Sequence, residues 1–348
     1  MAVDRPISDR YRTVLLIALG LLTAMLWLAC MLFGSVDIPA DRVAAIVLGQ
    51  SNDASEETWR TIILMSRLPS ATTAMFAGMA LALAGLQMQT TFNNPLAGPS
   101  ILGVSTGASL GVAVVLLAAS GAVMGYLGVA TASIIGAFLG AGVILLLLLG
   151  FSRIVRSTAM LLIVGIIIGY LASSLISLLN FFATQEGVHS FVIWGMGSFG
   201  GMTLERLGIF APLCLLGIIA SFIYVKPLDA MLLGENYARN LGVNVSRTRN
   251  GLLLLSGALT AVVTAFCGPI GFIGLIVPHI ARLILRTSSH IWILGGTALC
   301  GSAIMLLCQL ISVMPRSSII PINAITPIIG APIIIYIIVN RNKIFYLR

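Results

Sequence analysis

The chain has 348 residues, of which 59% are hydrophobic and only 9% are charged, and its formal net charge is +8. Its mean hydropathy of +1.08 is far above what a soluble core needs, and its apolar runs repeatedly reach the ~20 residues that cross ~30 Å of hydrocarbon as a helix. These values exclude a soluble protein. Because Gly and Pro break the apolar runs without alternating polar residues, the predicted fold class is all-α, a polytopic membrane protein, and not a β-barrel.

The hydropathy pattern divides the chain into about ten transmembrane spans within a single domain covering residues 1–348. The spans are expected near residues 13–36, 67–91, 100–118, 124–150, 158–183, 205–225, 249–267, 271–286, 290–312 and 326–340. The first apolar run, from Thr13 to Val36, is too long for the core of a signal peptide, so we interpret it as a retained helix.

Basic residues fall mostly on one side of the predicted membrane. With the N-terminus in the cytoplasm, most Lys and Arg residues lie in cytoplasmic loops, and those expected outside are Arg42, Arg60, Arg67, Arg206 and Arg316. This asymmetry follows the positive-inside rule and predicts a multi-pass protein with both termini cytoplasmic. The charge of +8 then reflects topology and membrane lipid, and no nucleic-acid partner is expected.

Patterns that would indicate a catalytic centre are missing from the sequence. The five cysteines lie in or beside apolar spans without a Cys-x-x-Cys pair, which favours core thiols over redox or metal roles. Neither Lys226 nor Lys343, the only lysines, follows a glycine, so the chain lacks a P-loop and cannot hydrolyse ATP by that route. The three histidines are scattered. We assign no catalytic residue, no metal site and no cofactor to this chain.

Ionisable residues are also missing from the middle of the predicted spans. Every Asp and Glu maps to a loop or to a span edge. A transporter driven by a proton or sodium gradient usually keeps an ionisable side chain at membrane depth. The pattern therefore argues against gradient coupling, although unwound backbone carbonyls could still bind sodium.

Small residues recur at four-residue spacing in three of the spans. One set contains Gly103, Gly107 and Gly111, and the pairs Gly136/Gly140 and Gly165/Gly169 repeat the pattern. Small residues let membrane helices approach closely, so packing seams are the simplest interpretation. A smooth, small-residue pore wall is the alternative.

Two stretches interrupt the membrane pattern with Pro, Gly and Asn, "FNNPLAGPSILGVSTGASL" (92–110) and "CGPIGFIGLIVPHIARLIL" (267–285). Both are expected to form a helix, a turn and a second helix from opposite sides of the membrane, which is a weak signature of an inverted repeat. Asn93 and Asn94 either satisfy freed backbone groups or face a gated pathway. His279 and Arg282 share a helix face, and we interpret them as a packed histidine and a snorkelling charge, or as part of a cytoplasmic contact surface.

A short polar stretch, "LDAMLLGENYARNLGV" (228–243), stands out within this apolar chain. Pro227 can start a helix, Asp229 favours its positive end, and Gly234 and Gly242 punctuate the stretch. The segment 227–245 is therefore predicted to form two short cytoplasmic helices. Their shape suggests docking to a partner, and an interfacial helix lying on lipid headgroups is the alternative.

Four sequence blocks occur in a fixed order between Arg67 and Ile338: "RLPSATTAMFAGMALALAGLQMQTTFNNPLAGPSILGVSTGASLG", "LDAMLLGENYARNLGV", "GPIGFIGLIVPHIARLIL" and "PINAITPIIGAPIIIYII". Together they resemble the FecCD family, the permeases of type II ABC importers for ferric siderophores, haem and vitamin B12. The resemblance implies a ten-helix protomer in the bacterial inner membrane. It also implies three kinds of partner: a second permease copy or paralogue, two ABC ATPase subunits that hold ATP and Mg, and a periplasmic or lipid-anchored substrate-binding protein.

The resemblance also assigns roles to individual positions. The residues matching the ATPase-coupling helices are Leu228, Asp229, Leu233, Gly234, Glu235, Ala238, Arg239, Leu241 and Gly242. Those expected at the cytoplasmic gate and pathway are Asn94, Pro95, Leu96 and Thr158, with Gly103 and Gly107. Those expected to dock the binding protein are Arg60, Arg67 and Arg316.

The chain departs from the family pattern at several positions. Ser70 stands where a second docking arginine is common, and Ala159 stands where a second gate hydroxyl is found. Gln309 lies about where Asp is frequent, and Asn323 replaces the usual Gly. Trp194 belongs to the expected outer mouth, where it could equally anchor the membrane interface.

The function predicted is inward movement of an iron–siderophore, haem or corrinoid by alternating access, driven by a separate ATPase. The alternatives are an ABC permease for free metal ions and a gradient-driven secondary transporter. The sequence does not indicate which chelate is carried, or whether the partner permease is identical.

Overall fold

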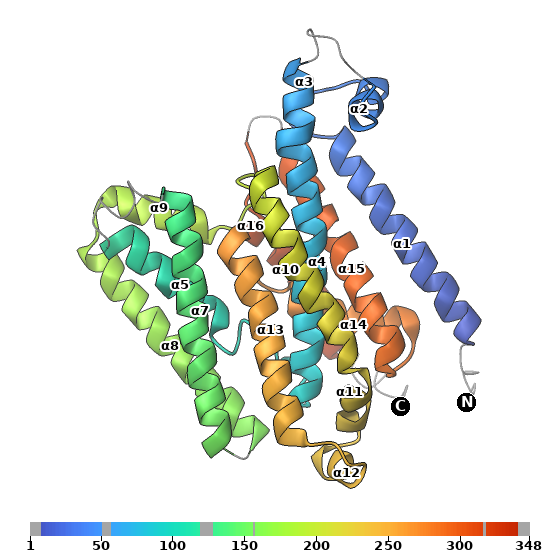
Figure 1. The fold of residues 1–348 in the computed structure, drawn as a ribbon, viewed down its shortest axis with the longest axis vertical. Coiled ribbons are helices and arrows are strands. Elements are labelled where there is room, and N and C mark those ends of the chain that lie inside the picture. The colour runs from blue at the N-terminus through green and yellow to red at the C-terminus, as the bar shows by residue number, and fades with distance from the viewer. Residues whose placement is uncertain (1–7, 51–56, 119–127, 156, 316–317, 340–348) are drawn as a thin grey trace.

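The structure is a computed structural model, which describes residues 8–50, 57–118, 128–155, 157–315 and 318–339. These residues form helices and connecting loops, without a strand among them (Figure 1). The helices are α1 Asp9–Leu32, α2 Ala40–Val47, α3 Glu57–Thr61, η2 Ile62–Arg67, α4 Leu68–Thr91, α5 Val104–Ala113, η3 Val114–Ala118, α7 Val129–Ile154, α8 Thr158–Phe182, α9 Gln185–Gly195, α10 Leu204–Ile223, α11 Val225–Leu232, α12 Glu235–Asn240, α13 Val245–Cys267, α14 Ile273–Leu285, α15 His290–Val313 and α16 Ile322–Val339. The all-α prediction is confirmed.

Ten apolar segments of the described chain correspond to the ten predicted spans. Seven are long enough to cross a membrane, and three shorter ones cover Val104–Ala118, Ile273–Leu285 and Ile322–Tyr336. The first two are short because the Pro- and Gly-containing stretches 92–103 and 268–272 precede them in non-helical conformation. Helices α3, η2 and α4 run on without a break from Glu57 to Thr91, so this helix begins ten residues before the predicted start at residue 67.

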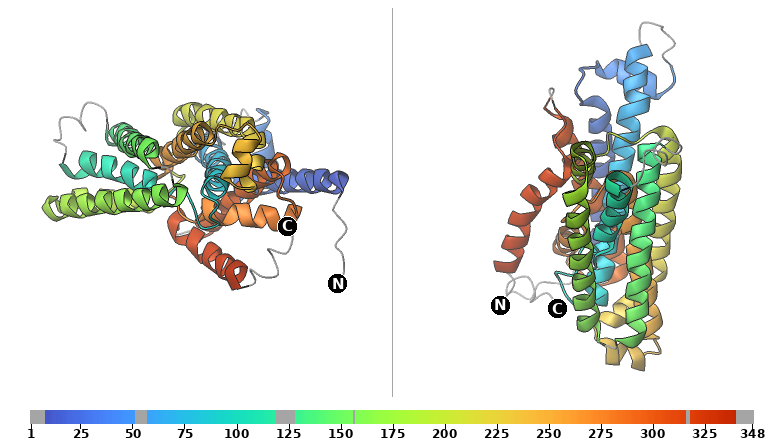
Figure 2. Two further views of the ribbon diagram at one scale, coloured as in Figure 1. Left: turned by 90° about the horizontal axis from the view of Figure 1, so that it is seen from below. Right: turned by 90° about the vertical axis from the view of Figure 1, so that its left-hand side faces the viewer.

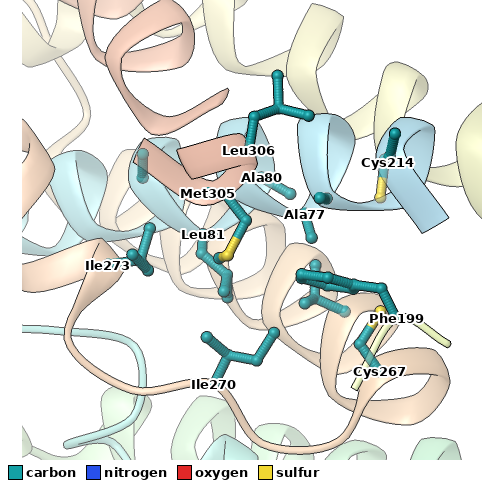
Figure 3. Packing of buried hydrophobic residues seen from close by; sticks show 14 of the residues in the cluster. Ala77, Ala80, Leu81, Phe199, Cys214, Cys267, Ile270, Ile273, Met305 and Leu306 are labelled. Atoms are coloured by element: carbon teal, nitrogen blue, oxygen red, sulfur yellow. The ribbon is translucent and has the colours of Figure 1, made fainter. Parts of the chain in front are cut away.

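Helix α4 forms the centre of the larger helix group. It packs against α10, α13, α14 and α15, and α1 covers the outer side of α15 (Figure 1). Figure 3 shows Ala77 and Leu81 of α4 gathered with Met305 of α15, Phe199 and Cys267 in one apolar cluster. Glycines allow the closest approaches, since a Cβ on Gly85 would lie 1.7 Å from the Gly274 carbonyl oxygen. All five cysteines are buried and free, which confirms the prediction of core thiols.

Helices α5, α7 and α8 form a second group, which joins the first through α13 (Figures 1 and 2). The predicted glycine faces meet here. A Cβ on Gly107 would lie 2.8 Å from the Gly140 carbonyl oxygen, and one on Gly111 would lie 1.8 Å from that of Gly136. Such contacts confirm packing seams.

Gly103 and Gly107, which were expected at the gate and pathway, both lie in these helix contacts. Gly103 has φ +80 and lies against α8, where a Cβ would approach Gly169 to 3.1 Å. Gly107 is buried against Ile144 and Gly140 of α7. The four-residue spacing is the same for a seam and for a pore wall, so the sequence alone did not separate them.

The two short helices α11 and α12 lie at one end of the bundle, below α10 and α13 (Figure 1). The start of α1 and the end of α16 lie at this same end, while α2, α3 and α9 lie at the other (Figures 1 and 2). This arrangement is what an even number of crossings requires. We call the end with α11 and α12 the coupling end.

Candidate coupling and gating region

Two short helices form the predicted coupling segment, and glycines set the bend between them and the turn after them. Helix α11 ends at Leu232 and α12 begins at Glu235. Gly234 between them has φ +100, and Gly242 after α12 has φ +82. Side chains disfavour this left-handed region, so both positions favour glycine although no neighbouring atom lies near a Cβ at either.

Not every matched coupling residue faces outward. The exposed ones are Leu233, Arg239, Leu241 and Gly242, and Tyr237 joins them although the resemblance did not mark it. Asp229, Gly234 and Glu235 are half-buried, and Glu235 pairs with Arg239 at 3.5 Å along α12. Leu228 and Ala238 are fully buried in the core of the helix bundle. Within the segment these two side chains face the core and anchor the short helices to it.

Asp229 is turned toward the helix bundle and joins α11 to α15. Its Oδ1 accepts a hydrogen bond from the main-chain N–H of His290 at 2.7 Å and lies 2.8 Å from the ring Nδ1 of the same residue. Ser289, the residue before α15, makes no side-chain cap, so Asp229 caps α15 from another element. The buried His290 ring also reaches Thr90 near the end of α4, with Nε2 3.1 Å from Oγ1.

The loop after α4 contains the predicted gate residues. Asn93 has φ 44, and the side chain of Asn94 accepts a hydrogen bond from the Leu96 N–H at 2.9 Å. This local Asx turn leaves the Leu96 side chain 46% exposed. The Pro95 carbonyl oxygen lies 2.9 Å from Nε2 of His279. Thr158 is half-buried at the first position of α8, after Ser157, which caps that helix.

Arg282 does not snorkel as predicted. Its Nη1 donates to Oε1 of Gln89 on α4 at 2.9 Å, and Nε2 of Gln89 donates to the Leu275 carbonyl at 2.9 Å. An arginine near a helix end can reach either water or a neighbouring helix. No local pattern indicates the contact with the neighbouring helix, because Gln89 is 193 positions away.

Arg67, which was expected to dock the binding protein, lies in a buried position beside the end of α1. The side chain is buried and donates to the carbonyls of Met31 at 2.7 Å, Leu32 at 2.9 Å and Val36. Arg67 thus satisfies carbonyl groups at and after the end of α1. Arg60 on α3 is exposed, and Arg316 lies outside the described residues.

Asn323, which stands where the family usually has Gly, makes two hydrogen bonds to neighbouring loops. Its side-chain oxygen accepts the Gly271 N–H at 3.2 Å, and its own N–H donates to the Met196 carbonyl at 3.1 Å. The start of α16 is thereby tied to the loops after α9 and α13. In the described part of the chain, no three His, Cys, Asp or Glu residues gather to hold a metal ion.

Comparisons with known proteins agree with this architecture. The model of the FecCD transport family matches residues 21–340. The vitamin B12 import system permease protein BtuC of Salmonella typhi is 36% identical over 283 residues, which is 80% of this chain and 83% of that protein. The same protein of Salmonella newport gives equal values.

Two solved structures are also similar. A metal-chelate type ABC transporter in an inward-facing conformation matches with a TM-score of 0.80 and 31% identity, covering 94% of this chain and 99% of the other. PsaBC from Streptococcus pneumoniae, in complex with a Fab, matches with a TM-score of 0.53 and 14% identity over 84% of this chain and 94% of the other, which supports the fold alone.

Proposed function

Because the chain belongs to the FecCD transport family and is a permease of a type II ABC importer, we propose that it moves a metal chelate or corrinoid inward across the bacterial inner membrane. The candidates are an iron–siderophore, haem and a vitamin B12-like corrinoid. Two observations support this class: the curated relatives are named as vitamin B12 import permeases, and the similar structure is of metal-chelate type. Family membership sets aside the gradient-driven alternative.

The coupling end carries the mechanistic part of the proposal. Leu233, Tyr237, Arg239 and Leu241 are exposed there on or beside α12, while Leu228 and Ala238 hold the segment in the core. An apolar patch with one cation, on a rigidly anchored helix pair, suits docking into a groove of an ATPase subunit. ATP binding on two such subunits would move the helix pair, and the gate loop with Leu96 would follow as a bistable element.

A polar strip on α8 supports a pathway for a large, hydrophilic substrate. Tyr170, Ser173, Ser174 and Ser177 are exposed and share one helix face. Polar side chains within a span usually face a bundle interior or a water-filled cavity. We propose that this strip faces the pathway and that a second permease copy or paralogue completes it. Arg60 is proposed to contact a periplasmic or lipid-anchored binding protein, and both chain termini are proposed to be cytoplasmic.

Uptake into proteoliposomes tests the proposal. The permease, purified with its co-purifying subunits and its binding protein, is assayed with labelled cobalamin, a ferric siderophore and haem while ion gradients are collapsed. We expect uptake of one of these compounds, and we expect it to require ATP on the side of the membrane that carries the ATPase subunits. Uptake of free metal ions in place of all three, or uptake without ATP, would overturn it. Mass spectrometry of the purified complex separates a homodimer from a heterodimer.

A further inference from the structure

The coupling segment and the gate loop are connected through buried polar side chains from two other helices, α15 and α4. Asp229 of α11 contacts His290 at the start of α15, and His290 contacts Thr90 at the end of α4. From Thr90 the chain continues within a few residues to Asn94 and Leu96 of the gate loop. Resting on the function proposed above, we propose that the contacts Asp229–His290–Thr90 form a relay that transmits movement of the coupling helices to the gate.

The chemistry of the three groups determines which atom donates and which accepts in each hydrogen bond of this relay. A carboxylate can only accept hydrogen bonds, so the neutral His290 ring facing Asp229 carries its proton on Nδ1. Its Nε2 is then an acceptor, and the Thr90 hydroxyl donates to it across 3.1 Å. Asp229 also accepts the His290 main-chain N–H, so the carboxylate holds both the ring and the helix end. One side chain of α11 is therefore fastened to α15 and, through one ring, to α4.

Burial makes these contacts stiff. The His290 ring is 1% exposed and Thr90 is buried, whereas the Asp229 side chain is 38% exposed at the coupling end. A buried polar group that loses its partner has no water to replace it, so the partners are expected to move together. Helix α11 also contacts both α4 and α15 directly.

A second set of bonds holds the far end of the gate loop. Arg282 bonds to Gln89, which directly precedes Thr90, and His279, one helical turn before Arg282 on α14, bonds to the Pro95 carbonyl. The gate loop is thus held between the end of α4 and the face of α14. When α11 pulls on the end of α4, the loop between these two attachments must change its position. His290 and Thr90 act as positioning residues, since they reach the gate only through other groups.

Residue Thr91 supplies a matched control. Thr90 and Thr91 are adjacent, both are buried, and both belong to the last turn of α4. The hydroxyl of Thr91, however, has no hydrogen-bond partner within the described part of the chain. Thr90→Val and Thr91→Val both replace a hydroxyl by a methyl group at neighbouring positions. Only Thr90→Val deletes a hydrogen bond of the relay.

The test measures how ATP changes the accessibility of the gate. Leu96→Cys places a thiol on an exposed gate position, and the five native cysteines are buried and so add little background. The complete importer complex is labelled with a soluble maleimide, with and without ATP and vanadate. Losing one buried hydrogen bond shifts an equilibrium by about fivefold. We expect Thr90→Val to reduce the ATP-dependent change in labelling rate by about this factor, while Thr91→Val leaves it as in the parent.

Rescue variants separate the relay from general damage. Thr90→Ser keeps the hydroxyl and should keep the response. His290→Asn places an amide donor where Nδ1 lay, so it keeps the contact with Asp229 but cannot reach Thr90, and it should behave as Thr90→Val does. The double variant should be no worse than either single one, because both delete the same hydrogen bond.

The outcomes distinguish this relay from the proposed function. If the parent Leu96→Cys complex shows no response to ATP, the coupling function itself fails, and the relay fails with it. If the parent responds and Thr90→Val responds to the same extent, only the relay is overturned. An equal loss in Thr91→Val and Thr90→Val would also overturn it, since that would reflect packing at the helix end. Thermal stability of each complex is measured alongside, and His290→Asn provides the test if Thr90→Val unfolds.

Discussion

Replacing Arg67 tests whether this residue holds the protein together or docks a partner. The guanidinium donates to three carbonyls, with N–O distances of 2.7 Å to Met31 and 2.9 Å to Leu32 and a third bond to Val36. In Arg67→Ala each acceptor loses a charge-assisted bond, and an unsatisfied buried group costs about 1–3 kcal/mol. Water can reach part of this region, because Leu32 and Val36 are themselves exposed. The net loss should therefore be about 2–4 kcal/mol, less than the sum of three full penalties.

The assay compares Arg67→Ala with Arg60→Ala in detergent by thermal unfolding, and in vesicles by association with the binding protein. For Arg67→Ala the melting temperature is expected to fall by roughly 5 °C or more. The exposed Arg60 should leave the melting temperature unchanged, but its removal should slow association and weaken its dependence on salt. The reasoning is refuted if Arg67→Ala melts like the parent and instead weakens binding-protein association.

Two further substitutions test packing and coupling. Gly85→Ala should destabilise the protein by about 1–3 kcal/mol, because its Cβ would lie 1.7 Å from the Gly274 carbonyl oxygen. Gly142→Ala is the control, because no atom lies within 4 Å of its new Cβ. Equal melting temperatures for these two variants would contradict close packing at Gly85. Glu235→Lys should leave the protein folded but lower transport per ATP hydrolysed, because it replaces the Glu235–Arg239 pair with two like charges on the coupling surface. Normal coupling in that variant would show that this surface does not engage an ATPase.

The sequence predicted those features that depend on local patterns. Hydropathy located the ten apolar segments, and the glycine and proline signals placed the bend at Gly234 and the turn at Gly242. These features depend only on which residues stand close together along the chain. The resemblance then located the coupling segment, but it could not say that Leu228 and Ala238 face inward, because a motif marks positions and not the side of the helix that is covered.

The contacts that the sequence could not predict join residues far apart in the chain. Asp229 and His290 are 61 positions apart, and Thr90 and His290 are 200 positions apart. Nothing in the local pattern of any of these residues indicates a partner. The contacts of Arg67 were not predicted for a related reason: a basic residue at a predicted span edge is equally consistent with solvent and with the unpaired carbonyls of a neighbouring helix end.

Photo-crosslinking from the coupling segment tests the central claim most directly. Tyr237 on α12 is 52% exposed, so an aromatic photo-crosslinking amino acid is placed there. Arg60 on α3, at the opposite end of the bundle, provides the control position. After irradiation of native membranes, mass spectrometry should identify an ABC ATPase joined at position 237 and absent at position 60. Recovery of that ATPase in the purified complex without any adduct at position 237 would contradict the account.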